Sequence, residues 1–177
     1  MQQDASPPDP SLPPWPQYAE AVVEFVLEDA HVVLTPCAAS DAVAHALAPW
    51  GAPVWVLTAG DPYPLQLTRR ENAQRNAELK TDIERLGLRH HPALGRAPDD
   101  STFERSVAVR DTTRADMLAL ARRYGQLAVY EIDDRIRCVD VATAHVVTST
   151  PFQIVTSPVT EDDLMHLTGR EEDPDRC

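Results

Sequence analysis

The fold is decided by a strand and a helix that follow one another in VWVLTAGDPYPLQLTRRENAQRNAELKTDIERLG (residues 54–87). Residues 54–59 form a nearly continuous apolar run, which is typical of a central strand buried on both faces. The turn sequence GDP ends this run. Thr68 and Glu71 then have the spacing of a capping box, in which each side chain bonds the backbone of the other residue. We therefore predict a strand over 54–59 and a helix over 68–86.

Two asparagines, Asn72 and Asn76, lie on the stripe of this helix that should contact the core. At 100° per residue the same stripe continues through apolar residues, which are Leu79, Ile83 and Leu86. A half-buried amide without a hydrogen-bond partner costs about 1–3 kcal/mol. One interpretation is therefore structural: the amides bond the ends of neighbouring strands and the loop over 60–65.

The other interpretation is functional, because the end of a strand and the start of the next helix form a natural ligand crevice in α/β units. A second polar set follows at Glu104, Ser106 and Gln126, near the phenol of Tyr130. Such groups could act in general acid–base catalysis or form a satisfied core network. The candidate ligand-binding residues are Thr58, Asp61, Asn72, Asn76, Glu104, Ser106 and Gln126. We assign no catalytic residue among them.

The rest of the chain extends this strand–helix unit. Residues 21–36 predict a β-hairpin, with a helix over 18–27 as the rival, and residues 39–51 predict a helix. Further strands are predicted over 88–95, 105–110, 127–132, 135–141 and 145–150, and a helix over 115–124. The fold class is α+β: a mixed β-sheet with a central β-α-β-β-α-β unit and helices mainly on one face.

Three regions follow from composition. Residues 1–16 are rich in proline and predict a disordered arm, residues 17–157 a single α+β domain, and residues 158–177 an acidic, mostly disordered tail. Within that tail we expect one helical turn over 162–167.

Charge and cysteine content exclude several classes of protein. The formal net charge is −12 over 177 residues, whereas nucleic-acid binding normally needs a basic surface, so it is not expected. Neither a bilayer-spanning apolar run nor a signal peptide is evident, so we expect a cytoplasmic protein without membrane contact. Cys37, Cys138 and Cys177 have no metal-ligand spacing, and we expect neither a metal nor a cofactor. Cys37, before a predicted helix start, is a candidate nucleophile to which no base is assigned.

Five short motifs together resemble an uncharacterised bacterial family, domain of unknown function 3293. They are TAGDP (58–62), ENxxRN (71–76), PALGR (92–96), ERS (104–106) and YGQxAVY (124–130). The resemblance covers residues 18–133. Members of the family typically have TAxNP, so Asp61 replaces the usual asparagine. The family implies no activity, cofactor or catalytic residue.

Two functional predictions remain open. The first is a small-molecule-binding domain with a polar pocket at the junction of strand 54–59 and helix 68–86, for which an enzymatic role stays undecided. The alternative is a non-catalytic acidic interaction or regulatory module with a basic protein partner. Convergence of the candidate side chains on one concave space would favour the first.

Overall fold

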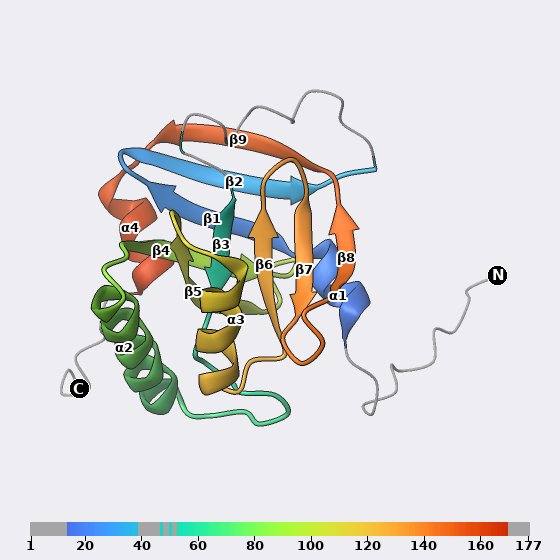
Figure 1. Ribbon diagram of the computed structural model, residues 1–177. Helices are drawn as coiled ribbons and strands as arrows, with labels where there is room; N and C mark the ends of the chain where they lie inside the picture. The colour runs from blue at the N-terminus through green and yellow to red at the C-terminus, as the bar shows by residue number, and fades with distance from the viewer. Residues whose placement is uncertain (1–13, 39–46, 48–49, 51–52, 170–177) are drawn as a thin grey trace.

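The computed structural model describes residues 14–38, 47, 50 and 53–169 (Figure 1). In chain order, its elements are α1 (Trp15–Glu20), β1 (Val22–Leu27), β2 (Ala30–Pro36), β3 (Val54–Leu57), α2 (Arg69–Arg85), β4 (His90–Arg96), β5 (Phe103–Val109), α3 (Arg114–Arg123), β6 (Ala128–Ile132), β7 (Ile136–Asp140), β8 (Val146–Thr150), β9 (Phe152–Pro158) and α4 (Glu161–Thr168). The helix predicted over 39–51 lies outside the described residues, apart from Leu47 and Trp50.

The strands form one nine-stranded sheet in the order β8-β7-β6-β3-β5-β4-β1-β2-β9. Its centre, β6-β3-β5-β4, is the predicted β-α-β-β-α-β unit: α2 connects β3 to β4, and α3 connects β5 to β6. The α+β prediction is confirmed. The expectation of a mixed sheet is refined, because every pair of neighbouring strands is antiparallel. Each crossover helix links strands that have another strand between them, so parallel strands never become neighbours.

The N-terminal segment forms the predicted hairpin, and the rival helix over 18–27 is wrong. β1 pairs with β2 through a tight turn at which Glu28 has a positive φ of 56°. A short helix, α1, occupies residues 15–20 instead, with a proline in its first turn. Proline is tolerated there because the first helical N–H groups have no partner within the helix. The last two residues of the predicted arm are therefore helical.

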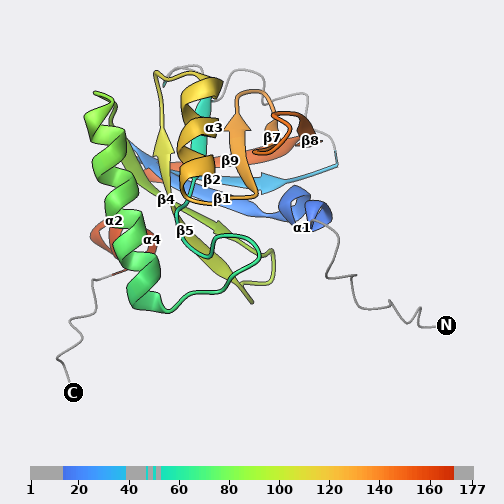
Figure 2. The ribbon, with the colours of Figure 1, turned by 60° about the horizontal axis from the view of Figure 1, so that its bottom comes forward.

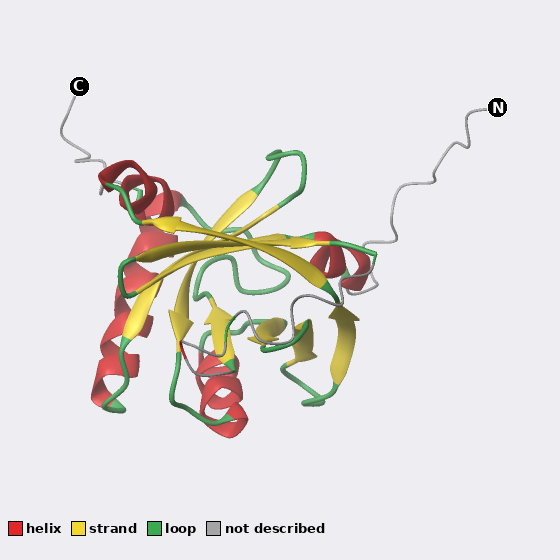
Figure 3. Ribbon diagram, turned by 90° about the horizontal axis from the view of Figure 1, so that it is seen from above, coloured by secondary structure: helices red, strands yellow, loops and turns green. Residues whose placement is uncertain are grey.

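The sheet curls strongly, and the chain connectivity requires it to. β8 and β9 occupy opposite edges of the sheet, yet Pro151 alone separates them in sequence. β1, β2 and β9 run across the view of Figure 1, whereas β6, β7 and β8 run up and down it, and the view from above shows the long strands on one side and the shorter strands on the other (Figure 3). Apolar side chains from both halves meet inside the curl, including Phe25, Leu34, Val56 and Phe152. We call this inner surface of the sheet the concave face.

The opposite, convex face carries three of the helices. Leu79 and Ile83 of α2 pack with Trp55, Leu57 and the apolar side of α3 in a second core cluster. α4 packs against β1 and β4, where Val26 and Leu94 alternate with residues of the concave face. The prediction that helices lie mainly on one face agrees with this arrangement.

Two details differ from expectation at the ends of helices. Leu86 was predicted to contact the core but is 52% exposed, because α2 ends at Arg85 and Leu86 is its C-cap. In the region predicted as an acidic tail, α4 is a capped helix of eight residues whose Leu167 is 1% exposed. None of the helices in the described ranges is both long and apolar enough to cross a membrane.

Candidate functional site

Asn76 of α2, one of the two asparagines, holds the start of the segment that follows β3. Its Oδ1 accepts a hydrogen bond from the backbone N–H of Ala59 at 2.9 Å. The adjacent Thr58 hydroxyl, which is buried, donates to the carbonyl of Arg105 at 2.9 Å and accepts from the N–H of Gly60 at 3.0 Å. These bonds continue the contact between β3 and β5 past the end of the ladder, where the backbone of the loop no longer pairs.

Asn72 fixes the next turn of the same loop. Its Oδ1 accepts from the N–H of Asp61 at 2.8 Å, and its Nδ2 donates to Asp61 Oδ1 at 2.9 Å. The same carboxylate oxygen accepts from the N–H of Leu67 at 2.7 Å, which closes the loop on itself. Asp61 has a φ of 33°, a conformation that aspartate and asparagine tolerate better than most residues. The structural interpretation of the two asparagines is confirmed.

Two further side chains connect this loop to the end of α3. Gln126 Nε2 donates to the carbonyl of Gly60 at 2.6 Å. Arg75 donates through Nε to the carbonyl of Ala59 at 2.6 Å and through Nη2 to the carbonyl of Tyr124. Arg75 belongs to the ENxxRN motif but was not among the candidate site residues, although its position one residue before Asn76 places it at the same loop.

Five of the seven candidate residues therefore form one hydrogen-bonded group: Thr58, Asp61, Asn72, Asn76 and Gln126. Most of their bonds go to loop backbone, so the group builds and holds the loop. We call residues 60–67 the β3–α2 loop.

The other two candidates, Glu104 and Ser106, lie on the concave face. Along β5, Val107 and Val109 belong to the convex cluster and Ala108 to the concave one. Strand alternation then places Ser106 and Glu104 on the same side as Ala108. The Ser106 hydroxyl donates to the carbonyl of Glu104 at 3.3 Å.

Among the described aspartates and glutamates with a shifted pKa, Glu104 is the one whose pKa is raised. Burial raises the pKa of Glu104 to about 7, and the nearby charge of Asp61 raises it further. Both influences disfavour the carboxylate, and no hydrogen bond or basic side chain of the described residues offsets them. Asp61 thus couples the β3–α2 loop to the concave face, because its charge raises the pKa of Glu104.

Two tyrosines, Tyr18 and Tyr130, are near enough to Glu104 for its charge to act on their phenols. The Tyr130 hydroxyl donates to the carbonyl of Tyr18 at 3.1 Å, and the two rings are 6.0 Å apart. Burial raises the pKa of Tyr18 and of Tyr130, and the charge of Glu104 contributes to both. Tyr63 of the loop contributes to the raised pKa of Tyr18. The group is completed by Cys138, whose thiol pKa burial raises to about 12, so it is an inert thiol.

Two clefts are found elsewhere on the surface. The larger, of about 440 Å³, lies between the end of α2 and the start of α3, and the smaller, of about 260 Å³, lies between β4 and α4. The smaller is lined by Glu24, Leu94, Arg96, Asp100, Phe103 and His166. Neither includes a candidate residue, so a pocket at the predicted residues stays a prediction.

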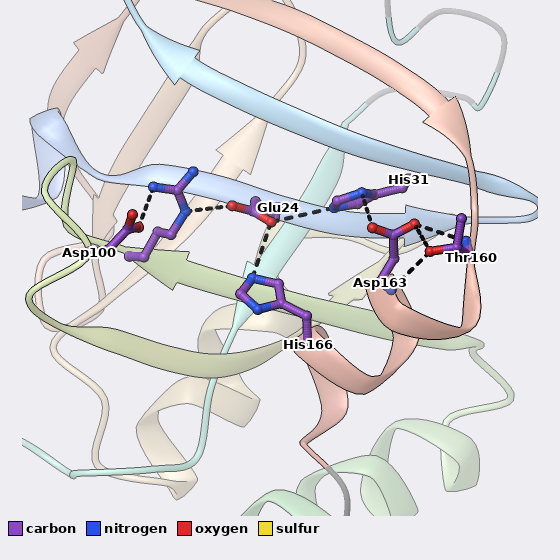
Figure 4. Close-up of polar contacts among 7 residues, drawn as sticks. Glu24, His31, Asp100, Thr160, Asp163 and His166 are labelled. Atoms are coloured by element: carbon purple, nitrogen blue, oxygen red, sulfur yellow. Dashed lines mark hydrogen bonds and ion pairs between the residues drawn. The ribbon is translucent and has the colours of Figure 1, made fainter.

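A charged network that the sequence analysis missed lies at the smaller cleft (Figure 4). Glu24 on β1 is 4% exposed, and its Oε1 accepts from Arg96 Nε at 2.5 Å. Its Oε2 lies 3.4 Å from His31 Nε2 and 3.5 Å from His166 Nε2. His31 Nδ1 lies 3.1 Å from the carboxylate of Asp163.

This network attaches α4 to the sheet, because Asp163 and His166 both belong to α4 whereas Glu24 and His31 belong to the β1–β2 hairpin. The signal in the sequence was a lone glutamate inside the apolar run VVEFVL. A glutamate in a buried strand requires a hydrogen-bond or ion-pair partner. Among the described residues, no three His, Cys, Asp or Glu side chains are placed to hold a metal ion.

The central unit of the sheet is also the part that a known family covers. Residues 57–129 match DUF3293. This family is described as a protein family of unknown function, and the match confirms the resemblance over the span from the end of β3 into β6. No curated protein and no solved structure matches the chain significantly.

Proposed function

We propose that the chain binds a small polar ligand on the concave face, between Glu104 and the β3–α2 loop. The observation that supports this proposal is the state of Glu104: a half-buried carboxyl with a pKa of about 7, and without a protein partner in the described residues. An unpaired acid that is partly removed from water lowers the stability of a fold, and strongly perturbed acids are concentrated at functional sites.

The candidate residues divide into two roles in this proposal. Glu104 and Ser106 would contact the ligand, together with the phenol groups of the concave face. Thr58, Asn72, Asn76 and Gln126 would position the loop that borders the site. The first two and Gln126 bond its backbone, and Asn76 bonds the N–H of Ala59 just before it. Asp61 belongs to both, because its charge acts on Glu104 while it caps the loop.

An enzymatic role follows as an extension of the same proposal. A carboxyl with a pKa of about 7 exchanges protons readily at neutral pH, as a general acid or base requires. We assign Glu104 this role if the bound ligand is transformed.

The experiment is a thermal-shift screen of polar metabolites on the full chain, followed by backbone NMR of any hit. A ligand of this site should shift the amide resonances of Ser106 and its neighbours on β4 and β5, and Glu104→Gln should weaken it. Glu78→Gln, an exposed acid on α2, is the matched control. Hits that map only to the 440 Å³ cleft would refute the location.

One observation favours the alternative, an acidic interaction module. α4 exposes Leu164 and Met165, by 38% and 44%, next to the acids of its first turn. A basic partner helix with an apolar stripe would complement this surface. Replacing both residues with serine should abolish capture of such a partner; unchanged capture would exclude α4 as the interaction surface.

A further inference from the structure

An open space lies beside Glu104 on the concave face. Gly95 of β4 pairs directly with Glu104 of β5 on one side and with Val23 of β1 on the other. Directly opposed residues point to the same face of a sheet. A methyl group added to Gly95 would meet no atom within 4 Å. The row Val23–Gly95–Glu104 therefore has a gap at its middle, into which the Glu104 carboxyl can reach.

The charge at this space is negative and uncompensated. Asp61 is close enough for its charge to raise the pKa of Glu104 and so to disfavour ionisation of that carboxyl. The basic side chains of this region contact other groups: Arg105 lies over the ring of Phe103, Arg96 bonds Glu24 and Asp100 on the convex side, and Arg75 bonds loop carbonyls. An anion would be repelled here, whereas a cation would restore the missing counter-charge.

Two tyrosine rings on which the charge of Glu104 acts suit a cation as well. Tyr18 and Tyr130 lie 6.0 Å apart at a mutual tilt of 53°, and Trp15 continues the aromatic group 5.9 Å from Tyr18. Aromatic faces attract organic cations, most strongly where water is excluded. Figure 2 brings this end of the molecule forward, with α1 and the β3–α2 loop on the same side as the start of β5.

We propose that the ligand of the concave face is a small organic cation, an amine or quaternary ammonium, which sits over Gly95 and pairs with Glu104 and Asp61 beside the rings of Tyr18 and Tyr130. This inference rests on the proposed function and names the chemical class that the site selects. Binding couples to protons, because a cation favours the ionised form of Glu104 and so displaces its proton.

The test is an NMR titration of the labelled full chain with choline and with its neutral carbon isostere, dimethylbutanol. Choline carries a fixed charge, so any change of its affinity with pH reports on the protein. We expect choline to shift the amides of Gly95 and Ser106 saturably, with an affinity that rises about tenfold from pH 6 to pH 8. The isostere should not bind measurably.

Two variants isolate the charge and the space. Glu104→Gln should weaken choline binding about tenfold or more and remove its pH dependence, because a charge-assisted contact is lost. Gly95→Leu keeps both carboxylates but fills the gap, and should also prevent binding. Glu78→Gln should leave the affinity unchanged.

Equal binding of the two probes, or binding that Glu104→Gln leaves intact, would overturn the cation proposal. A neutral or anionic metabolite that shifts the same amides would also overturn it while leaving the proposed function standing. If no cation and no other polar compound shifts these amides, both proposals fail.

Discussion

Replacing Glu104 with glutamine should stabilise the fold above neutral pH. Burial and the charge of Asp61 raise the pKa of Glu104 from 4.5 to about 7. The folded state therefore holds the proton more tightly than the unfolded state. Stability falls as the pH rises through this window, and the full penalty is present above a pH of about 7. At about 1.36 kcal/mol for each pKa unit, the difference corresponds to about 3 kcal/mol at most.

Glutamine resembles the protonated acid in shape, so Glu104→Gln removes the penalty without leaving a gap. Compared with the original chain, the variant should gain up to about 3 kcal/mol of unfolding free energy at pH 8 and less than about 1 kcal/mol at pH 5. Urea unfolding followed by circular dichroism at several pH values measures this difference. Glu78→Gln provides the baseline for loss of an exposed charge. A stability difference between variant and original chain that does not change over this range would refute the burial of Glu104.

Three other substitutions test the contacts described above. Asn76→Ala leaves the N–H of Ala59 without its acceptor and should lower the unfolding free energy by about 1–3 kcal/mol in urea titrations; an unchanged midpoint would show that water replaces the amide. Glu24→Ala leaves Arg96 unpaired beside a buried site and should cost about 3–5 kcal/mol, with faster hydrogen exchange in α4 before the rest of the chain; uniform exchange would contradict the attachment of α4 by this network. Hydrogen bonds from Thr160 and the nearby charges of His31 and His166 lower the pKa of Asp163 below 3.8. The contribution of Asp163 to stability is therefore present above pH 3.8 and is lost as the pH falls through the lowered pKa. Asp163→Asn should abolish this acid-induced loosening of α4, followed through the methyl resonances of Leu167, and a variant that loosens like the original chain would refute the assignment.

Local signals made the elements near β3 predictable. The apolar run over 54–57, the Thr68–Glu71 capping box and the partners of Asn72 and Asn76 all follow from short-range chemistry: strand burial, helix capping and amide satisfaction. The order of strands and helices was then sufficient to predict the β-α-β-β-α-β unit, because its two crossovers admit few arrangements.

Long-range contacts were not predictable in the same way. Glu24 finds its partners on β2, β4 and α4, which lie 7 to 142 residues away in sequence, and nothing local indicates which cation a buried acid will meet. The raised pKa of Glu104 also depends on a distant segment, because the charge of Asp61 in the β3–α2 loop contributes to it. The sequence analysis placed Glu104 and Asp61 in one set of candidates, but it did not predict which of the candidates lie on the concave face of the sheet.

The single-residue link between β8 and β9 has a consequence for how the chain reaches its native state. β2 has β1 on one side and β9 on the other, so its outer edge is covered only by residues 152–158. An unpaired edge is a template for pairing with other chains. During synthesis β2, residues 30–36, is made well before its covering strand, residues 152–158. Protection from aggregation therefore depends on late residues, and the region from 57 to 129 would leave the apolar concave face open if it were produced alone.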